Sequence, residues 1–105
     1  MAEPLRRYEI LLPLNFNDGQ PVPKESLIRT RAELKERFGA ISAESQVIRG
    51  EDEESGAIGD RLTRVFVDVP DTAENVRFFQ QLKERLKQRF DQLDIWMTTH
   101  PVERL

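Results

Sequence analysis

The ten residues 60–69, DRLTRVFVDV, constrain the fold more than any other part of the chain. Valine recurs at every second position, at Val65, Val67 and Val69, while polar and aromatic residues fill the positions between them. This alternation, rich in β-branched side chains, predicts a strand with one buried face and one mixed face. Because a single strand is not stable alone, the rest of the chain must supply neighbouring strands.

Three further segments have the character of strands. Residues 7–14, RYEILLPL, alternate Tyr8, Ile10 and Leu12 with a mixed face. Residues 40–49 predict a second strand, which enters the polar turn EDEESG. Residues 92–100 predict a last strand, which we expect Pro101 to end because proline cannot continue the hydrogen-bond ladder.

Two segments between these strands have helical periodicity. The first begins near Pro23 and ends before Gly39, where a left-handed residue is usual, and its apolar stripe is Leu27, Ile28, Leu34 and Phe38. The second follows Pro70, with Asp71 as the expected N-cap and Glu74 completing a variant capping box. Its buried stripe is predicted to hold Val76, Phe79, Leu82, Leu86 and Phe90.

The order strand, helix, strand, strand, helix, strand resembles the ferredoxin-like βαββαβ fold of the α+β class. That resemblance, which is one of architecture alone, implies a four-stranded antiparallel sheet in the order 4-1-3-2 with both helices on one face. A similar arrangement is the dimeric α/β barrel, in which two such sheets pack their bare faces together. We expect one domain over residues 1–105, with 1–6 and 102–105 as tails.

The resemblance divides the apolar residues between two faces. The face beneath the helices collects Ile10, Leu12, Leu14, Val65, Val67, Val69, Ile95 and Met97, with Leu93 on the same side of its strand. The opposite face carries Leu11, Pro13, Leu62, Phe66 and Trp96. A contiguous exposed apolar patch of this kind usually marks a binding or association surface.

Composition excludes several kinds of site. The chain has no cysteine and one histidine, which removes thiol nucleophiles, thiolate zinc sites and multi-histidine metal sites. The block EDEE at 51–54 lacks the spacing of a calcium loop, and Asp68 and Asp94 are expected at the other end of the face from His100. We therefore expect no metal and no cofactor.

Charge and hydropathy also restrict the partners. Sixteen basic and nineteen acidic residues give a net charge of −3, which disfavours nucleic acid, although the segment 77–89 is locally basic. The third strand also lacks the paired aromatics of an RNA-recognition motif. The longest apolar run, Ile10 to Leu14, is too short to span a membrane, and the N-terminus lacks a secretory pattern, so we expect a cytoplasmic protein.

Glu9, Arg64 and His100 are the candidate catalytic residues. In the expected sheet they form a polar cluster at the rim of the open face, where a carboxylate beside an imidazole can make a general base. The simpler interpretation is a cross-strand ion pair beside a surface histidine.

The sequence favours a small soluble protein without catalytic chemistry of its own, which forms a homodimer through Leu11, Leu62, Phe66 and Trp96. Trp96 is then a dimer contact, and its alternatives are the wall of a ligand pocket or a partly exposed position. The enzyme alternative places a small-molecule site between the two sheets. A nucleic-acid module that uses the basic second helix is the third hypothesis.

Overall fold

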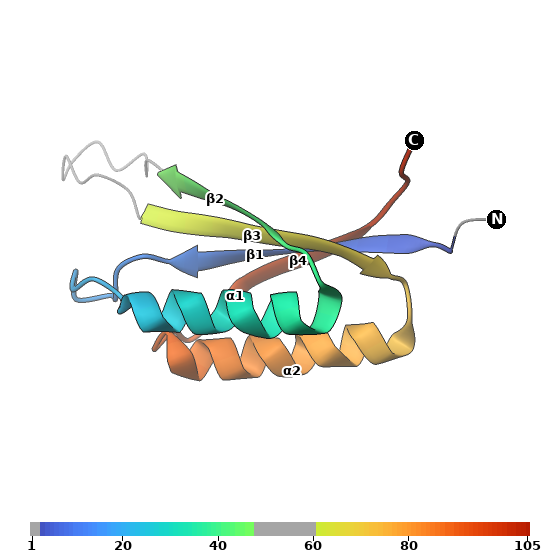
Figure 1. Ribbon diagram of the computed structural model, residues 1–105. Coiled ribbons are helices and arrows are strands. Elements are labelled where there is room, and N and C mark those ends of the chain that lie inside the picture. The colour runs from blue at the N-terminus through green and yellow to red at the C-terminus, as the bar shows by residue number, and fades with distance from the viewer. Residues whose placement is uncertain (1–2, 48–60) are drawn as a thin grey trace, which may run out of the picture.

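The computed structural model describes residues 3–47 and 61–105. Within them the chain forms four strands and two helices in the predicted order (Figure 1). The elements are β1 (Leu5–Pro13), α1 (Lys24–Phe38), β2 (Ser42–Val47), β3 (Arg61–Pro70), α2 (Ala73–Arg89) and β4 (Trp96–Val102). The last residues of the second predicted strand, 48 and 49, and the acidic block 51–54 lie outside the described residues.

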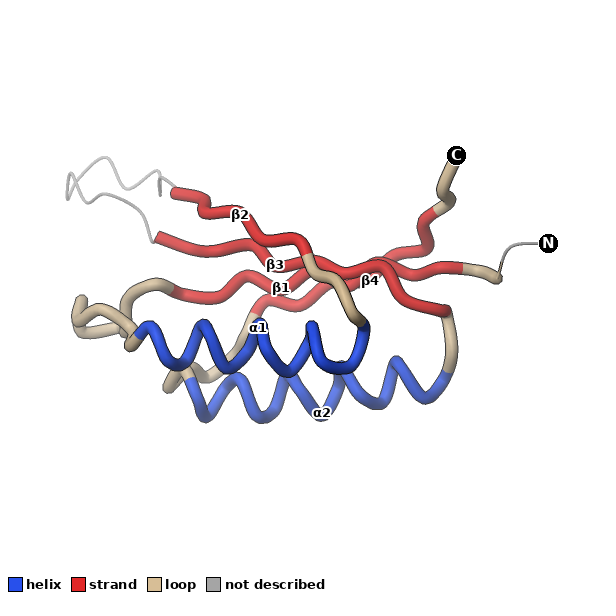
Figure 2. The backbone as a smooth tube through the Cα atoms, viewed as in Figure 1, coloured by secondary structure: helices blue, strands red, loops and turns tan. Residues whose placement is uncertain are grey.

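The strands form one sheet in the order β2-β3-β1-β4, with every neighbouring pair antiparallel. Both helices lie on one face of this sheet, and the other face is left without a helix (Figures 1 and 2). The ferredoxin-like α+β fold and its strand order are therefore confirmed. β1 lies between β3 and β4: all its residues pair with β3, and those from Leu5 to Leu11 also pair with β4.

The core lies between the sheet and the helices. Tyr8, Ile10 and Leu12 of β1 are buried, as are Val65, Val67 and Val69 of β3, which confirms the face predicted from alternation. The helices contribute Leu34, Phe79, Leu82 and Leu86, and the adjoining residues Phe90 and Ile95 are also buried. Among the other residues predicted on this face, Met97 is half-buried and packs against the core, whereas Leu14 is half-buried beyond the end of β1.

Two predicted helix details are wrong. Ile28 was placed in the α1 stripe, but 63% of it is exposed and Thr30 is buried instead. The Thr30 hydroxyl can enter the core because it donates to the carbonyl of Ser26. The N-cap of α2 is Thr72 and not Asp71, because the Thr72 side chain accepts from the backbone N–H of Asn75, whereas Asp71 forms an ion pair with Arg6.

The last strand also differs from the prediction. The chain turns away from α2 at Asp91, whose φ is 50°, and residues 92–95 connect this turn to the strand. Leu93, which was predicted to face the core, is exposed. The strand therefore starts at Trp96 and passes through Pro101 to Val102. Proline is tolerated there because β4 is an edge strand. The sheet thus extends into both expected tails, since β1 begins at Leu5.

Candidate functional site

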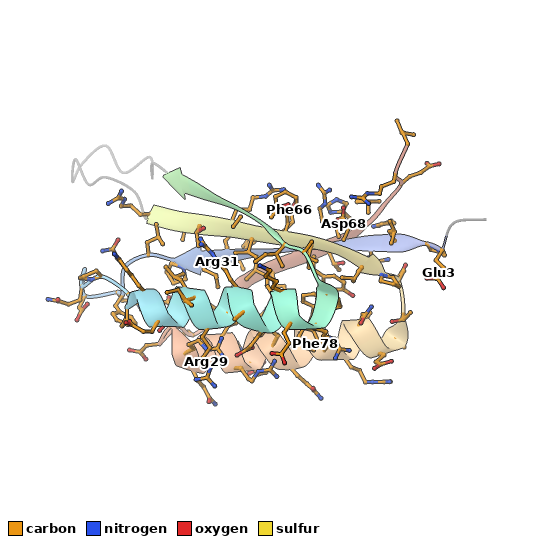
Figure 3. All side chains as sticks on the ribbon, in the orientation of Figure 1. Glu3, Arg29, Arg31, Phe66, Asp68 and Phe78 are labelled. Atoms are coloured by element: carbon orange, nitrogen blue, oxygen red, sulfur yellow. The ribbon has the colours of Figure 1, made fainter. Side chains whose placement is uncertain are left out.

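The sheet surface without helices, called the open face below, carries most of the residues singled out in the sequence. Alternation along the strands brings together Arg7, Glu9, Leu11, Leu62, Arg64, Phe66, Asp68, Trp96, Thr98 and His100. Figure 3 shows Phe66 and Asp68 on this side, away from the helices.

Trp96 is the most exposed apolar residue of the open face. It lies directly opposite Leu11 in the ladder between β1 and β4, and 65% of it is exposed. Leu11 lies opposite Arg64 on β3, and Leu62 lies opposite Pro13. Leu11, Leu62 and Phe66 are half-buried, so the sheet itself covers part of each side chain. The predicted apolar residues therefore share one face.

Ion pairs surround Phe66. Arg7 donates to both carboxylate oxygens of Asp68, over 2.7 Å from Nε and 3.0 Å from Nη2, and Arg64 pairs with Glu9. The two guanidinium carbons lie 4.8 Å and 4.3 Å from the centre of the Phe66 ring, within range of a cation–π interaction. The hydrogen bond from Arg7 lowers the pKa of Asp68 and outweighs the opposing effect of burial.

His100 lies opposite the beginning of β1, as predicted, but it is not directly opposite Glu9. The ladder pairs His100 with Arg7 and pairs Glu9 with Thr98, so His100 lies one step farther along the sheet than Glu9. Asp68 also lies opposite Arg7, at the same end as His100, which corrects its expected place at the far end. The reason is that β3 and β4 both run antiparallel to β1, so their last residues meet at its beginning.

The basic character of α2 is largely balanced by acidic neighbours. Lys83 pairs with Asp94, and Lys87 pairs with Glu84. Arg85 and Arg89 both contact Glu33 of α1. These carboxylates offset much of the positive charge that the sequence places on the C-terminal part of α2.

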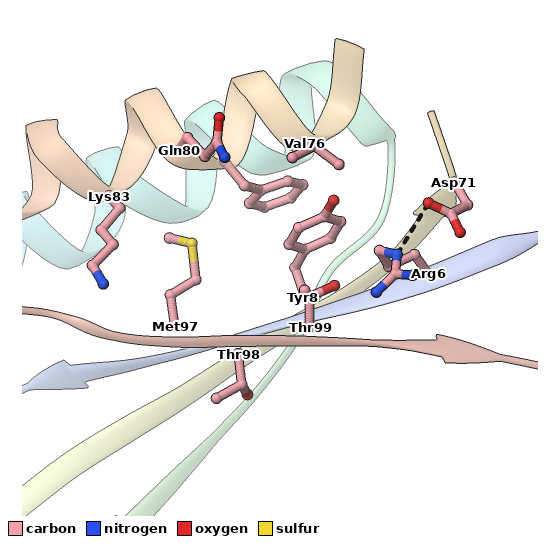
Figure 4. A pocket seen from close by; sticks show the side chains of 10 residues that line it. Arg6, Tyr8, Asp71, Val76, Gln80, Lys83, Met97, Thr98 and Thr99 are labelled. Carbon is pink, nitrogen blue, oxygen red and sulfur yellow. Dashed lines mark hydrogen bonds and ion pairs between the residues drawn. The ribbon is translucent and has the colours of Figure 1, made fainter. Parts of the chain in front are cut away.

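A cavity of about 310 Å³ lies at the edge of the fold between α2, β1 and β4 (Figure 4). Its lining includes Tyr8, Phe79 and Met97 within, and Arg6, Asp71 and Lys83 at its ends. Sequence reasoning missed this cavity. A weak signal was present, since threonine occupies position 99, where the alternation of β4 faces the helices and an aliphatic residue would fill the space.

Within residues 3–47 and 61–105, no group of three His, Asp or Glu side chains has the proximity of a metal site. Asp94 lies in the turn before β4, where a hydrogen bond from Lys83 lowers its pKa. None of the helices described in the structure is long and apolar enough to cross a membrane.

No protein-family model matches the chain, and no curated protein matches it. Solved structures do resemble it. A phage SAM lyase, solved in complex with S-methyl-5′-thioadenosine, is 14% identical with a TM-score of 0.65, and the match covers 99% of this chain and 93% of the lyase. A Bacillus cereus protein related to NIF3 is 9% identical with a TM-score of 0.58, covering 99% of this chain and 27% of the other. At these identities the likeness shows the fold alone.

Proposed function

We propose that the chain is an interaction protein that associates with a second copy of itself through the open face. The observation that carries this proposal is Trp96, which is 65% exposed beside Leu11 on a sheet surface that neither helix covers. Burying an aromatic side chain of this size at an interface contributes about 2–3 kcal/mol.

Charge favours a second copy over other partners. On β1 and β3 the open face carries two ion pairs, Arg7 with Asp68 and Arg64 with Glu9. Each pair is neutral, so these four side chains add no net charge to the open face. Two copies related by a twofold axis can therefore bring these pairs together without like-charge repulsion. Nucleic acid would instead require an excess of positive charge.

The solution mass, measured by light scattering over a range of concentrations, tests this proposal. Trp96 emission is recorded on the same samples, because it is the only tryptophan in the chain. We expect a dimer whose emission shifts to shorter wavelength as it forms. A mass that stays monomeric at every concentration, with unshifted emission, would contradict the proposal.

A pair of matched variants locates the interface. Leu11→Glu introduces a carboxylate opposite Arg64 on the open face, and Ile28→Glu introduces the same group on α1 in the other layer. We expect Leu11→Glu to raise the dissociation constant of the dimer at least about tenfold, or about 1.4 kcal/mol. Ile28→Glu should leave the constant unchanged. An equal effect of both substitutions would place the interface elsewhere.

A second candidate keeps the dimer and adds a small-molecule site between the two open faces, with Glu9, Arg64 and His100 at its rim. It is favoured by the likeness to the SAM lyase, whose structure contains S-methyl-5′-thioadenosine. Titration with that nucleoside, followed by Trp96 emission, tests it. A saturable change that disappears in Leu11→Glu supports a site between subunits, whereas no saturable change removes this candidate and leaves the dimer.

A further inference from the structure

The cavity between α2 and β4 exists because side chains fill the core less completely beside β4 than beside β1. On β1 the side chains that face the helices, such as Tyr8 and Ile10, are buried. On β4 the corresponding Met97 is only half-buried and Thr99 is exposed. The core is therefore filled over the central strands and open at this edge. Because the cavity lies on the helix side of the sheet, it does not depend on association through the open face.

Tyr8 brings a buried polar group to this cavity. Its ring stacks on Phe79, with centroids 3.8 Å apart and planes at 9°, and only 4% of the residue is exposed. Among the described residues its hydroxyl has no hydrogen-bond partner. Burial raises the pKa of Tyr8, and the neighbouring Thr99 side chain acts in the opposite direction. An unpaired buried hydroxyl costs free energy, so a partner that enters the cavity is stabilised there.

Lys83 places a positive charge at the other end of the cavity, with Met97 between it and Tyr8 (Figure 4). Its ammonium is 3.1 Å from Asp94, whose side chain is 71% exposed. An ion pair with so exposed a partner is weak, so Lys83 can turn to an anion in the cavity at little cost. At the Tyr8 end, Arg6 holds Asp71 over 3.0 Å.

We propose that this cavity binds a small carboxylate with a flat apolar body and a polar group at its opposite end. The carboxylate pairs with Lys83, the body lies along Met97, and the far polar group bonds to the Tyr8 hydroxyl. The volume of about 310 Å³ equals that of about ten water molecules and is at the lower end for ligand pockets, which limits the ligand to one ring or its equivalent.

Three related probes separate the parts of the proposal: 4-hydroxyphenylacetate, its neutral amide, and phenylacetate, which lacks the hydroxyl. Binding is followed by NMR shifts of the Thr99 backbone amide and the Gln80 side-chain amide, both at the cavity. We expect 4-hydroxyphenylacetate to bind most tightly. Lys83→Gln should weaken it roughly tenfold while leaving the amide unchanged. Tyr8→Phe should weaken it roughly fivefold while leaving phenylacetate unchanged.

Thr99→Leu is the matched variant that fills the cavity, at an exposed position where the fold tolerates replacement. We expect it to abolish binding of all three probes. The proposal is overturned by the absence of a saturable shift with 4-hydroxyphenylacetate, by equal binding in Thr99→Leu, or by acid and amide responding equally to Lys83→Gln. The titration is repeated in Leu11→Glu, so that binding in the cavity is measured independently of dimer formation.

Discussion

Arg89, the last residue of α2, donates from Nη1 to the hydroxyl of Thr30 in α1 over 2.8 Å. The two residues are separated by 59 positions in the sequence. Thr30 is fully buried, and the Arg89 side chain is 10% exposed and also contacts Glu33. This polar contact joins the two helices, and the buried hydroxyl, which donates to the carbonyl of Ser26, accepts a second hydrogen bond through it.

Replacing Arg89 tests how much that contact contributes. Arg89→Met keeps the length of the side chain but removes the donors to Thr30 and Glu33, so we expect the free energy of unfolding to fall by about 1–3 kcal/mol. Arg85→Met is the matched control, because Arg85 lies 3.6 Å from the same carboxylate but is 45% exposed. We expect the control to change stability by less than about 0.5 kcal/mol in urea unfolding. Equal losses would show that burial of Arg89 is not the cause.

The contrast between Thr30 and the valines of β3 shows what the sequence could predict. Alternation is a local property, so Val65, Val67 and Val69 could be assigned to the buried face without knowing their neighbours. The Thr30 hydroxyl donates to the carbonyl of Ser26 in its own helix, but it also accepts from Arg89 of the other helix, and no local pattern indicates that second partner. For that reason the sequence placed Ile28 in the core, where the structure has Thr30.

The same difference between local alternation and long-range contacts explains why only part of the candidate site was predicted. Alternation correctly placed Leu11, Phe66 and Trp96 on one face. Alternation does not fix the register between β1 and β4, so it could not show that His100 pairs with Arg7 and Glu9 with Thr98. The cavity beside Tyr8 depends on how tightly α2 closes over an edge strand, and sequence periodicity does not contain that information.

The N-cap of α2 offers a second test. Thr72→Ala removes the oxygen that accepts from the Asn75 N–H over 3.2 Å, so we expect a loss of about 1 kcal/mol in the free energy of unfolding. Thr72→Ser restores that oxygen and should recover most of the stability. Thermal unfolding of the three proteins measures the difference. If Thr72→Ser is as unstable as Thr72→Ala, the hydroxyl does not cap the helix.

The ion pair between Arg7 and Asp68 predicts a dependence of stability on pH. Because Arg7 lowers the pKa of Asp68 in the folded chain, this pair stabilises the fold above the ordinary carboxyl pKa, and the contribution is lost as pH falls below about 4. In Asp68→Asn the free energy of unfolding should fall less steeply over that range. Asp94→Asn is the control, since Asp94 is more exposed and its pairing with Lys83 is screened by solvent. A variant Asp68→Asn with an unchanged acid slope would exclude the pair as the source.

Tyr8→Phe removes the buried hydroxyl and leaves the stacked ring on Phe79 in place. Since that hydroxyl is buried without a hydrogen bond, we expect the variant to be more stable than the parent by about 1 kcal/mol. Urea unfolding of both proteins without added ligand measures the difference. Phe79→Leu serves as the control that disturbs the stack, and it should lower stability because Phe79 is buried. A loss of stability in Tyr8→Phe would mean that the hydroxyl already has a partner in the free protein, and the cavity would then have no unpaired group to offer a ligand.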